Sequence, residues 1–491
     1  MLVIFLFAVD ATIVSTSMPT IVAKLGGLDL YSWIFTIYML TSALATPVFG
    51  KLSDLFSRRK LMLIGIGIFV LGSTLCGAAQ SMEMMILFRA IQGLGGGAIY
   101  ALSFIIVGIL YQDEKRAKMQ GLISSIWGIA SILGPLAGGI IVEHWSWRWI
   151  FFVNLPITAA ASSLIIYGLK EEAAERHKPK LDLMGTGTLL LGLMLLFYGL
   201  SQSGHGQQEM NAKFFGMIVL AVVVLFLFFR IERRAEEPIV PLDLFKVRLF
   251  KISAFVTTAA AMGVFGAVSY LPLYLQGVMG IAASRAGLVL LLLSLSWTAG
   301  SILAGQWINK SGYRFVGLLG MTLLGFGYGL LVATSSRKGI VPVLISAVMI
   351  GMGMGFTNLT TLVAGQTSVS RRQIGVATST IMLLRSVGGA VAVSLMGTVL
   401  LNRMQHGLEQ LGSVGAELSI SVKEIVANPH NLLDPGTRSL IPQELLPKLV
   451  DALANATWYA FLTGFTLMLL GIAASLFLAP QTPATTPRPD S

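Results

Sequence analysis

Long apolar runs recur along the whole 491-residue chain, and they constrain the fold more than any other feature. Each run is about 20 residues long, the length that a helix needs to cross the hydrocarbon core of a bilayer. The chain is 55% hydrophobic and only 12% charged, whereas a soluble domain carries about a quarter charged residues. These features exclude a soluble globular fold and predict an integral membrane protein that crosses the bilayer many times.

The apolar runs predict an all-α polytopic membrane fold, because an open structure in lipid must satisfy its own backbone hydrogen bonds as helices do. We expect fourteen spans. They cover residues 2–24, 31–51, 61–79, 84–111, 118–142, 149–169, 183–202, 213–231, 250–275, 285–308, 315–334, 339–366, 374–402 and 456–479. Residues 1–8 are already apolar and lack a basic region and a cleavage site, so we expect a helix there and not a signal peptide.

The positive charge is distributed unevenly over the loops between these spans. The net charge of +11 would suggest nucleic-acid binding in a soluble protein. Here most lysines and arginines lie in alternate short loops, which indicates membrane orientation by the positive-inside rule. The sequence therefore predicts a multi-pass protein of the cell (inner or plasma) membrane, with both termini cytoplasmic, lipids as its surroundings and no nucleic-acid partner.

Cysteine and histidine usage argues against metal or cofactor chemistry. Cys76 is the single cysteine and lies in an apolar run, and the five histidines fall at helix ends or in loops. The chain also lacks the G-x-x-x-x-G-K-[ST] phosphate loop of ATP-driven pumps. We therefore expect no disulfide within the chain, no metal, no cofactor and no enzymatic activity.

An internal repeat predicts how the spans are grouped. Residues 50–60 and 305–314 each contain Gly, then Asp or Asn, then Arg, in a short link after a span. If the chain consists of two parallel six-helix halves with two helices inserted between them, the two links occupy equivalent positions in the two halves. Internal repeats of this kind are typical of secondary transporters. The predicted parts are an N-terminal half (1–170), the inserted helices with linkers (171–249), a C-terminal half (250–479) and a cytoplasmic tail (480–491).

The C-terminal half contains one long segment, 403–455, that we expect on the extracytoplasmic side. Its amphipathic stretches allow two interpretations, a small cap over an exit or a loose loop, and the sequence favours the loose loop. Nothing in the chain indicates an oligomer, so a monomer is expected.

Asp10 is the only acidic residue that falls deep within a predicted span. An ionisable group there costs roughly 2.5–3.5 kcal/mol on insertion scales, which makes it a functional candidate by default. Burial disfavours the charged carboxylate, so Asp10 is a candidate for a reversible proton carrier. In the fourth span, Arg89, Gly93, Gly97 and Ala101 share one helical face. Small residues allow a neighbouring helix to approach closely, and a buried arginine needs a partner.

The link at residues 50–60 combines small, acidic and basic residues. Gly50 permits close helix contact, and Asp54 is four residues from Arg58, so the two can pair on one helical face. Asp54 can also cap the N-terminus of a neighbouring helix. Together with Arg59, these residues are candidates for a latch that holds one conformational state. A plain positive-inside loop would explain the basic residues but not Gly50 or Asp54.

The fifth span contains a Gly-Pro pattern that ordinary membrane helices rarely combine. Ala130, Gly134 and Gly138 form a smooth stripe four residues apart. Pro135 lacks an N–H and is expected to bend the helix. Gly139 completes the pattern.

These motifs resemble the major facilitator superfamily, specifically its fourteen-helix drug:proton antiporters of the EmrB/QacA type. The resemblance covers nearly the whole chain. It implies that helices 1 and 4 lie together, so that Asp10 pairs with Arg89. It also identifies Gly134, Pro135, Gly138 and Gly139 as the motif that is characteristic of exporters. The family pattern has glycine where this chain has Ser57, which puts the shape of that turn in doubt.

The resemblance predicts a multidrug efflux transporter that confers antibiotic resistance. It would exchange protons for small hydrophobic or cationic drug-like compounds by alternating access. Aromatic and amide residues within spans are the candidates for lining its substrate cavity. They are Tyr38, Gln92, Trp127, Tyr270, Trp297 and Asn358. Arg385 follows the same Arg-plus-glycine pattern as Arg89, with no acidic partner identifiable within a span, and would face water, a lipid headgroup or an anionic substrate.

Three other functions remain open at the level of sequence. An exporter of lipids or other amphiphiles would share nearly every feature. A nutrient uptake facilitator would lack the pattern at Gly134 to Gly139, and a non-transporting sensor would not need both Asp10 and Arg89.

Overall fold

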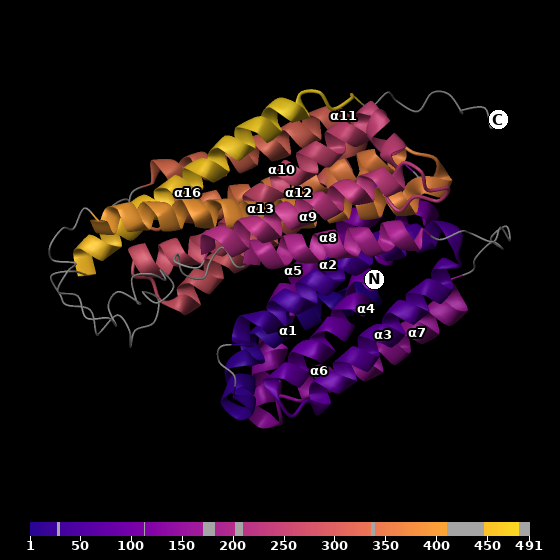
Figure 1. Ribbon diagram of the computed structural model, residues 1–491, viewed down its shortest axis with the longest axis horizontal. Helices are drawn as coiled ribbons and strands as arrows, with labels where there is room; N and C mark the ends of the chain where they lie inside the picture. The colour runs from indigo at the N-terminus through magenta and orange to yellow at the C-terminus, as the bar shows by residue number, and fades with distance from the viewer. Residues whose placement is uncertain are drawn as a thin grey trace. The chain divides into compact units, whose positions relative to one another are not determined.

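The computed structural model describes residues 1–26, 30–111, 113–169, 182–201, 210–334, 339–409 and 446–480, and every regular element in these residues is helical (Figure 1). The α-helices are α1 (Leu2–Leu25), α2 (Tyr31–Leu55), α3 (Arg58–Ala78), α4 (Met82–Leu110), α5 (Asp113–His144), α6 (Trp149–Phe152), α7 (Asn154–Gly168), α8 (Leu183–Ser201), α9 (Met210–Glu232), α10 (Arg248–Leu273), α11 (Ala283–Ala333), α12 (Val341–Thr367), α13 (Ile374–Glu409) and α16 (Leu446–Ser475). A π-helical turn, η4 (Tyr274–Val278), continues α10.

Eleven helices in the described part of the chain are long and apolar enough to cross a membrane. Shorter apolar runs lie in α1 (Leu2–Val14) and α8 (Met184–Leu200). The chain is therefore an all-helical, multi-pass membrane protein, as the apolar runs predict. The outward-facing side chains of α9 fit contact with lipid, because Phe215, Val219 and Phe226 are 57–60% exposed although all are strongly apolar.

Two predicted spans, 285–308 and 315–334, correspond to the two helical parts of α11. This element is divided at Gly312, whose φ of 77° is non-helical. A positive φ is costly for residues with a Cβ but not for glycine. The turn between the two predicted spans therefore lies at Gly312, within the repeat segment 305–314.

Three boundaries differ from the sequence-based expectation. The predicted span 149–169 consists of two helices, α6 and α7, that meet at Val153. Helix α13 continues to Glu409, and α16 begins at Leu446. The predicted loop 403–455 is therefore shorter at both ends, because its amphipathic flanks extend the neighbouring helices. Its central part, 410–445, and the tail beyond residue 480 lie outside the described residues.

The chain forms two compact units. The first comprises Met1–Met194, Val223–Ser253 and Leu362–Leu384, and the second comprises Leu195–Val222, Ala254–Thr361 and Arg385–Ser491. In the first unit, α2 and α3 pack against α4, α1 packs against α5, and α7 packs against α3. In the second unit, α16 packs along α11.

Small residues on α4 allow the close approach of α2 that their spacing predicts. A Cβ on Gly93 would lie 2.6 Å from the carbonyl oxygen of Tyr38, and a Cβ on Gly97 would lie 2.8 Å from Cα of Ser42. Both distances are too short for a side chain. Arg89 precedes these glycines on α4, so the tight α2–α4 packing also encloses its guanidinium.

Candidate functional site

A buried ion pair joins α1 and α4 within the first unit. Arg89 Nη1 donates to Asp10 Oδ2 at 2.8 Å, so the predicted pairing is present. Asp10 is 0% exposed and Arg89 is 1% exposed. At this degree of burial neither charge is solvated by water, and each depends on its protein partners.

Two amides complete the coordination of the Asp10 carboxylate. Gln92 Nε2 donates to Asp10 Oδ1 at 2.8 Å, while Gln92 Oε1 accepts from Arg89 Nη1 at 2.8 Å. Asn154 Nδ2, at the start of α7, donates to the same Oδ1 at 3.1 Å and to Ser73 Oγ at 2.9 Å. The hydroxyl of Ser73 in turn donates to the Phe151 carbonyl oxygen. Four helices besides α1 therefore fix the orientation of one carboxylate.

An aromatic ring covers the cationic side of this cluster. The Cζ atom of Arg89 lies 4.0 Å from the centroid of the Tyr38 ring, a cation–π contact that is worth about 2 kcal/mol when desolvated. Phe7 lies beside Tyr38, with ring centroids 6.1 Å apart, and Tyr100 and Trp127 contact Phe7 at 5.4 and 5.6 Å. The charge cluster thus borders an apolar aromatic cluster made of Phe7, Tyr38, Tyr100 and Trp127.

The segment at residues 50–60 contacts the start of α13. The sequence had instead predicted an ion pair within the segment, between Asp54 and Arg58. Helix α2 ends at Leu55 and α3 begins at Arg58, so Asp54 and Arg58 do not share a helical face. The Asp54 carboxylate instead accepts from the backbone N–H groups of Gly375 (2.9 Å) and Val376 (2.8 Å) at the start of α13. This is the second predicted role of Asp54, an anion at a helix N-terminus, where it meets the positive end of the macrodipole. Arg59 follows Arg58 in the first turn of α3.

Close packing and buried amides support the same contact. A Cβ on Gly50 would collide with the Ser379 side chain on α13, so glycine is required at this position. Nearby, Gln120 Nε2 on α5 donates to Gln366 Oε1 on α12 at 2.7 Å. Gln366 Nε2 donates to Thr378 Oγ1 on α13 at 2.9 Å. These three side chains are at most 1% exposed, so they form a buried polar chain that joins α5, α12 and α13.

The Gly-Pro pattern of α5 lies against α1. Ala130 is buried, and a Cβ on Gly134 would lie 2.8 Å from Cβ of Thr12 and 3.2 Å from the Ile13 nitrogen. Thr12 Oγ1 donates to the Ala130 carbonyl oxygen at 3.0 Å. Helix α5 continues through Pro135 to His144.

The two remaining glycines of this pattern differ in their surroundings. Gly138 is buried, whereas Gly139 is exposed, with no atom within 4 Å of its Cβ position. Only the buried positions of the pattern therefore contribute to close packing.

The six predicted cavity residues fall into separate environments. In the first unit, Gln92 and Tyr38 belong to the charge cluster, and Trp127 belongs to the aromatic cluster. In the second unit, Asn358 accepts from Arg385 Nη1 at 2.8 Å, which gives Arg385 an amide partner on α12. Tyr270 donates to the Val393 carbonyl oxygen at 2.5 Å, and Trp297 lies half-buried on α11.

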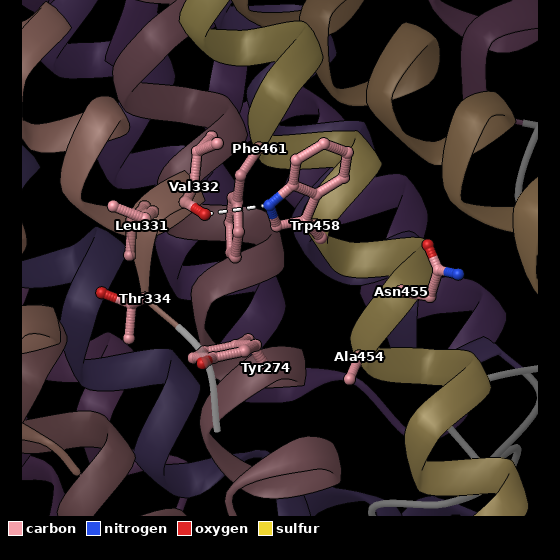
Figure 2. A pocket seen from close by; sticks show the side chains of 9 residues that line it. Tyr274, Leu331, Val332, Thr334, Ala454, Asn455, Trp458 and Phe461 are labelled. Atoms are coloured by element: carbon pink, nitrogen blue, oxygen red, sulfur yellow. Dashed lines mark hydrogen bonds between the residues drawn. The ribbon is translucent and has the colours of Figure 1, made fainter. Parts of the chain in front are cut away.

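A cavity of about 390 Å³ opens in the second unit, at the ends of α11 and η4 and along α16 (Figure 2). Aromatic and small polar side chains line it, and none of the predicted cavity residues does. The lining residues are Tyr274, Leu331, Val332, Ala333, Thr334, Ala454, Asn455, Trp458 and Phe461. Trp458 Nε1 donates to the Val332 carbonyl oxygen at 2.9 Å across one edge of this cavity (Figure 2).

Sequence reasoning placed Gln92 in a substrate cavity and assigned no role to Asn154 or Ser73. The signal for Gln92 was present, because it follows Arg89 by three residues and therefore shares its helical face. Asn154 and Ser73 are polar residues inside apolar spans, but the side chains that they contact depend on how α3 and α7 pack. Among the described residues, no group of three or more His, Cys, Asp or Glu side chains could hold a metal ion.

Two solved structures are similar to this chain in fold. One is the human organic anion transporter MFSD10 (TETRAN), with a TM-score of 0.63, 17% sequence identity, and coverage of 96% of this chain and 97% of that one. The other is a bacterial homologue of the human lysosomal transporter Spinster, with a TM-score of 0.57, 17% identity, and coverage of 98% and 97%.

Sequence comparison finds nearer relatives. The Multidrug transporter protein MdtP of Bacillus subtilis is 33% identical over 97% of this chain and 91% of its own length. Multidrug resistance protein 3 of the same organism is 33% identical over 98% of this chain and 94% of its own length. Efflux pump dotC of Dothistroma septosporum is 32% identical over 84% and 72%. Residues 1–393 match the Major Facilitator Superfamily, and the chain therefore belongs to that family of transporters.

Proposed function

We propose that this protein exports small, largely hydrophobic compounds in exchange for protons, by alternating access. Three relatives that cover most of the chain are named as a multidrug transporter, a multidrug resistance protein and an efflux pump, which supports export of such compounds. The observation that carries the proton coupling is the fully buried Asp10 carboxylate, which is held by Arg89 at 2.8 Å.

Protonation of Asp10 would change the net charge of the cluster that it forms with Arg89. A protonated carboxyl no longer neutralises Arg89, and breaking a buried pair costs about 3–5 kcal/mol. Conformations in which Arg89 gains water or another acceptor then become favoured. One charge moving through 100 mV releases about 2.3 kcal/mol, so a membrane potential supplies energy of a comparable size. The carboxylate thus links proton binding to a shift between two conformations.

The contact between Asp54 and α13 is the proposed latch for one of these conformations. Its two charge-assisted hydrogen bonds join α2 to the start of α13. Gly50, Arg58 and Arg59 belong to the same segment. Release of Asp54 would leave two N–H groups at the start of α13 without these acceptors, so opening of the proposed latch costs free energy.

The proposed transmembrane arrangement has fourteen spans, as in the EmrB/QacA type. Eleven helices qualify by length and hydropathy. Division of α11 at Gly312 adds one, and α1 and α8 add two more. The two helices α8 and α9 are then the pair inserted between six-helix halves. The distribution of basic residues over the loops supports a proposed orientation with both termini on the cytoplasmic side of the cell membrane, and the proposed functional unit is a monomer.

The substrate is proposed to be a hydrophobic or cationic drug-like compound. Three rings of the aromatic cluster, Phe7, Tyr100 and Trp127, support this class, since aromatic faces bind both apolar groups and cations. We assign Tyr38 and Gln92 to the charge cluster instead, because both contact Arg89 directly.

The test is transport in proteoliposomes with an imposed pH gradient and a fluorescent lipophilic cation as substrate. Wild type should accumulate substrate against its gradient. Asp10→Asn should lose this accumulation while retaining downhill exchange, which shows that the variant is folded. Asp243→Asn is the matched control, because that carboxylate is 80% exposed and pairs with Lys246. Undiminished uphill transport by Asp10→Asn would refute the coupling role, and a fluorescent phospholipid as a second cargo tests for lipid export.

A further inference from the structure

The short helix α6 (Trp149–Phe152) lies between Arg148 and Asn154 in the first unit. Formation of a first helical turn is unfavourable by itself, so a helix of this length depends on tertiary contacts for its position. One such contact is made by its backbone, because the Phe151 carbonyl oxygen accepts from Ser73 Oγ on α3 at 2.8 Å. The other contacts of α6 with α3 involve the residue that precedes it and the ring at its end.

The side chain of Arg148 caps the C-terminal end of α3. Arg148 Nη1 donates to the carbonyl oxygens of Gly77 and Ala79, both at 2.7 Å. Carbonyl groups at the end of a helix lack intrahelical partners, and a positive charge is favourable at that end. The guanidinium also lies over the Trp147 ring, with Cζ 4.5 Å from the ring centroid. Arg148 therefore holds the start of α6 on the end of α3.

Close packing brings the other end of α6 to the same turn of α3. A Cβ on Gly77 would lie 2.7 Å from the Phe152 ring, which is too close for a side chain. Trp147 and Phe151 are buried and pack edge to face, with ring centroids 6.4 Å apart. Helix α6 is thus fixed on α3 by hydrogen bonds at Arg148 and by ring packing at Phe152.

Asn154 follows α6 by two residues and contacts both α3 and α1. Its Nδ2 donates to Ser73 Oγ at 2.9 Å and to Asp10 Oδ1 at 3.1 Å. The second distance is near the upper end of the usual range for an N–H···O hydrogen bond, about 2.7–3.2 Å. A small displacement of α6 away from α3 would therefore break the hydrogen bond to the carboxylate.

We propose that Arg148 is a positioning residue for Asp10. By holding α6 on the end of α3, Arg148 places the Asn154 amide within hydrogen-bond distance of the carboxylate. The hydrogen bonds of the Arg148 side chain in the described part of the chain go to α3, so its effect reaches Asp10 through the backbone of α6. This inference rests on the proposed role of Asp10 in proton coupling.

The single cysteine of the chain reports on the position of α6. Cys76 is buried in the last turn of α3, next to Gly77. In the purified full-length protein, a membrane-permeant maleimide should label Cys76 about tenfold faster in Arg148→Ala than in wild type, as expected when hydrogen bonds from a charged donor are lost. Arg148→Lys keeps the charge and N–H donors, so slow labelling should be largely restored.

Two further variants make the labelling result decisive. Arg285→Ala is the matched control, because Arg285 is an exposed arginine at the start of α11 and its loss should leave labelling unchanged. If Arg148→Ala does not fold, Arg148→Gln replaces it, since an amide can donate to one of the two carbonyl oxygens and should give an intermediate rate. Labelling as slow as in wild type would overturn the proposal.

Transport separates a positioning role from a general loss of stability. In proteoliposomes with an imposed pH gradient, the ratio of uphill accumulation to downhill exchange should fall in both Arg148→Ala and Asn154→Ala. Arg148→Lys should regain most of this ratio. If Arg148 acts through Asn154, the double variant should transport no worse than Asn154→Ala alone. Additive losses, or an unchanged ratio in Arg148→Ala, would overturn the positioning role.

Failure of the proposed function gives a different result. Undiminished uphill transport by Asp10→Asn would refute proton coupling at Asp10, whatever the Arg148 variants do. The labelling of Cys76 does not use transport, so it would still decide whether Arg148 holds α6 on α3. Loss of uphill transport in Asp10→Asn together with additive losses in the double variant would overturn the role of Arg148 alone.

Discussion

Asn154 Nδ2 donates a hydrogen bond to Asp10 Oδ1 at 3.1 Å, although 144 positions separate the two residues in the chain. The same amide nitrogen donates to Ser73 Oγ, which is held by the Phe151 carbonyl oxygen. The position of Asn154 is therefore set by α3, while its contact is with α1. Because the amide donates to the carboxylate, it supplies a hydrogen bond to an oxygen that is buried away from water.

Replacement of Asn154 by Leu should destabilise the protein. Loss of a hydrogen bond to a charged group costs about 1.5–3 kcal/mol, and leucine cannot replace the donor to Asp10 or to Ser73 Oγ. Ser73→Ala, which keeps the contact between Asn154 and Asp10, should lower stability less. Thermal unfolding in detergent measures both variants. An unchanged melting temperature in Asn154→Leu would contradict this role.

Replacement of Arg89 by Ala should strongly destabilise the protein. The change leaves Asp10 buried without its charge partner, at a cost of about 3–5 kcal/mol. The Asp10→Asn/Arg89→Ala double variant should be more stable than Arg89→Ala alone, because it contains no unpaired charge. Thermal unfolding in detergent measures both. If the double variant melts at a lower temperature than Arg89→Ala, the two residues do not form an energetically coupled pair.

The two glycines of α5 provide a matched comparison. Gly134→Ala would bring a methyl group to 2.8 Å from Cβ of Thr12, and overpacking of this kind costs about 1–3 kcal/mol. Gly139→Ala meets nothing within 4 Å and gains helix propensity. We expect a lower melting temperature for Gly134→Ala and an equal or higher one for Gly139→Ala. Equal destabilisation by both would show that α1 does not approach α5 at Gly134.

Replacement of Asp54 by Ala should expose the start of α13. The N–H groups of Gly375 and Val376 lose their acceptors, and loss of such a cap costs about 0.5–2 kcal/mol. Hydrogen–deuterium exchange at these two amides should accelerate by roughly twofold to thirtyfold, which is that energy range expressed as a rate ratio. Asp243→Asn serves as the control, with unchanged exchange expected. Unaltered exchange in Asp54→Ala would mean that the carboxylate does not protect α13.

The sequence predicts the helices well because a membrane span has a length and composition that are local properties. Spans such as 2–24 and 183–202 agree with α1 and α8 to within a residue or so. The start of α16 at Leu446 was missed, because its first turns contain Pro447, Lys448 and Asp451, so hydropathy alone does not include them. The division of the 149–169 span at Val153 was also missed, although Pro156, which has no N–H to donate to the Phe152 carbonyl oxygen, marks it.

The sequence by itself determined that this protein is a multi-pass helical membrane protein with a carboxylate, Asp10, and an arginine, Arg89, deep within its spans. A charge is so costly in an apolar span that its position alone identifies it as functional. Only the tertiary structure decided which groups surround these charges. Asp54 caps α13 from 321 positions away, and Asn154 reaches Asp10. Each contact depends on which faces of distant helices meet, and hydropathy alone does not predict that packing.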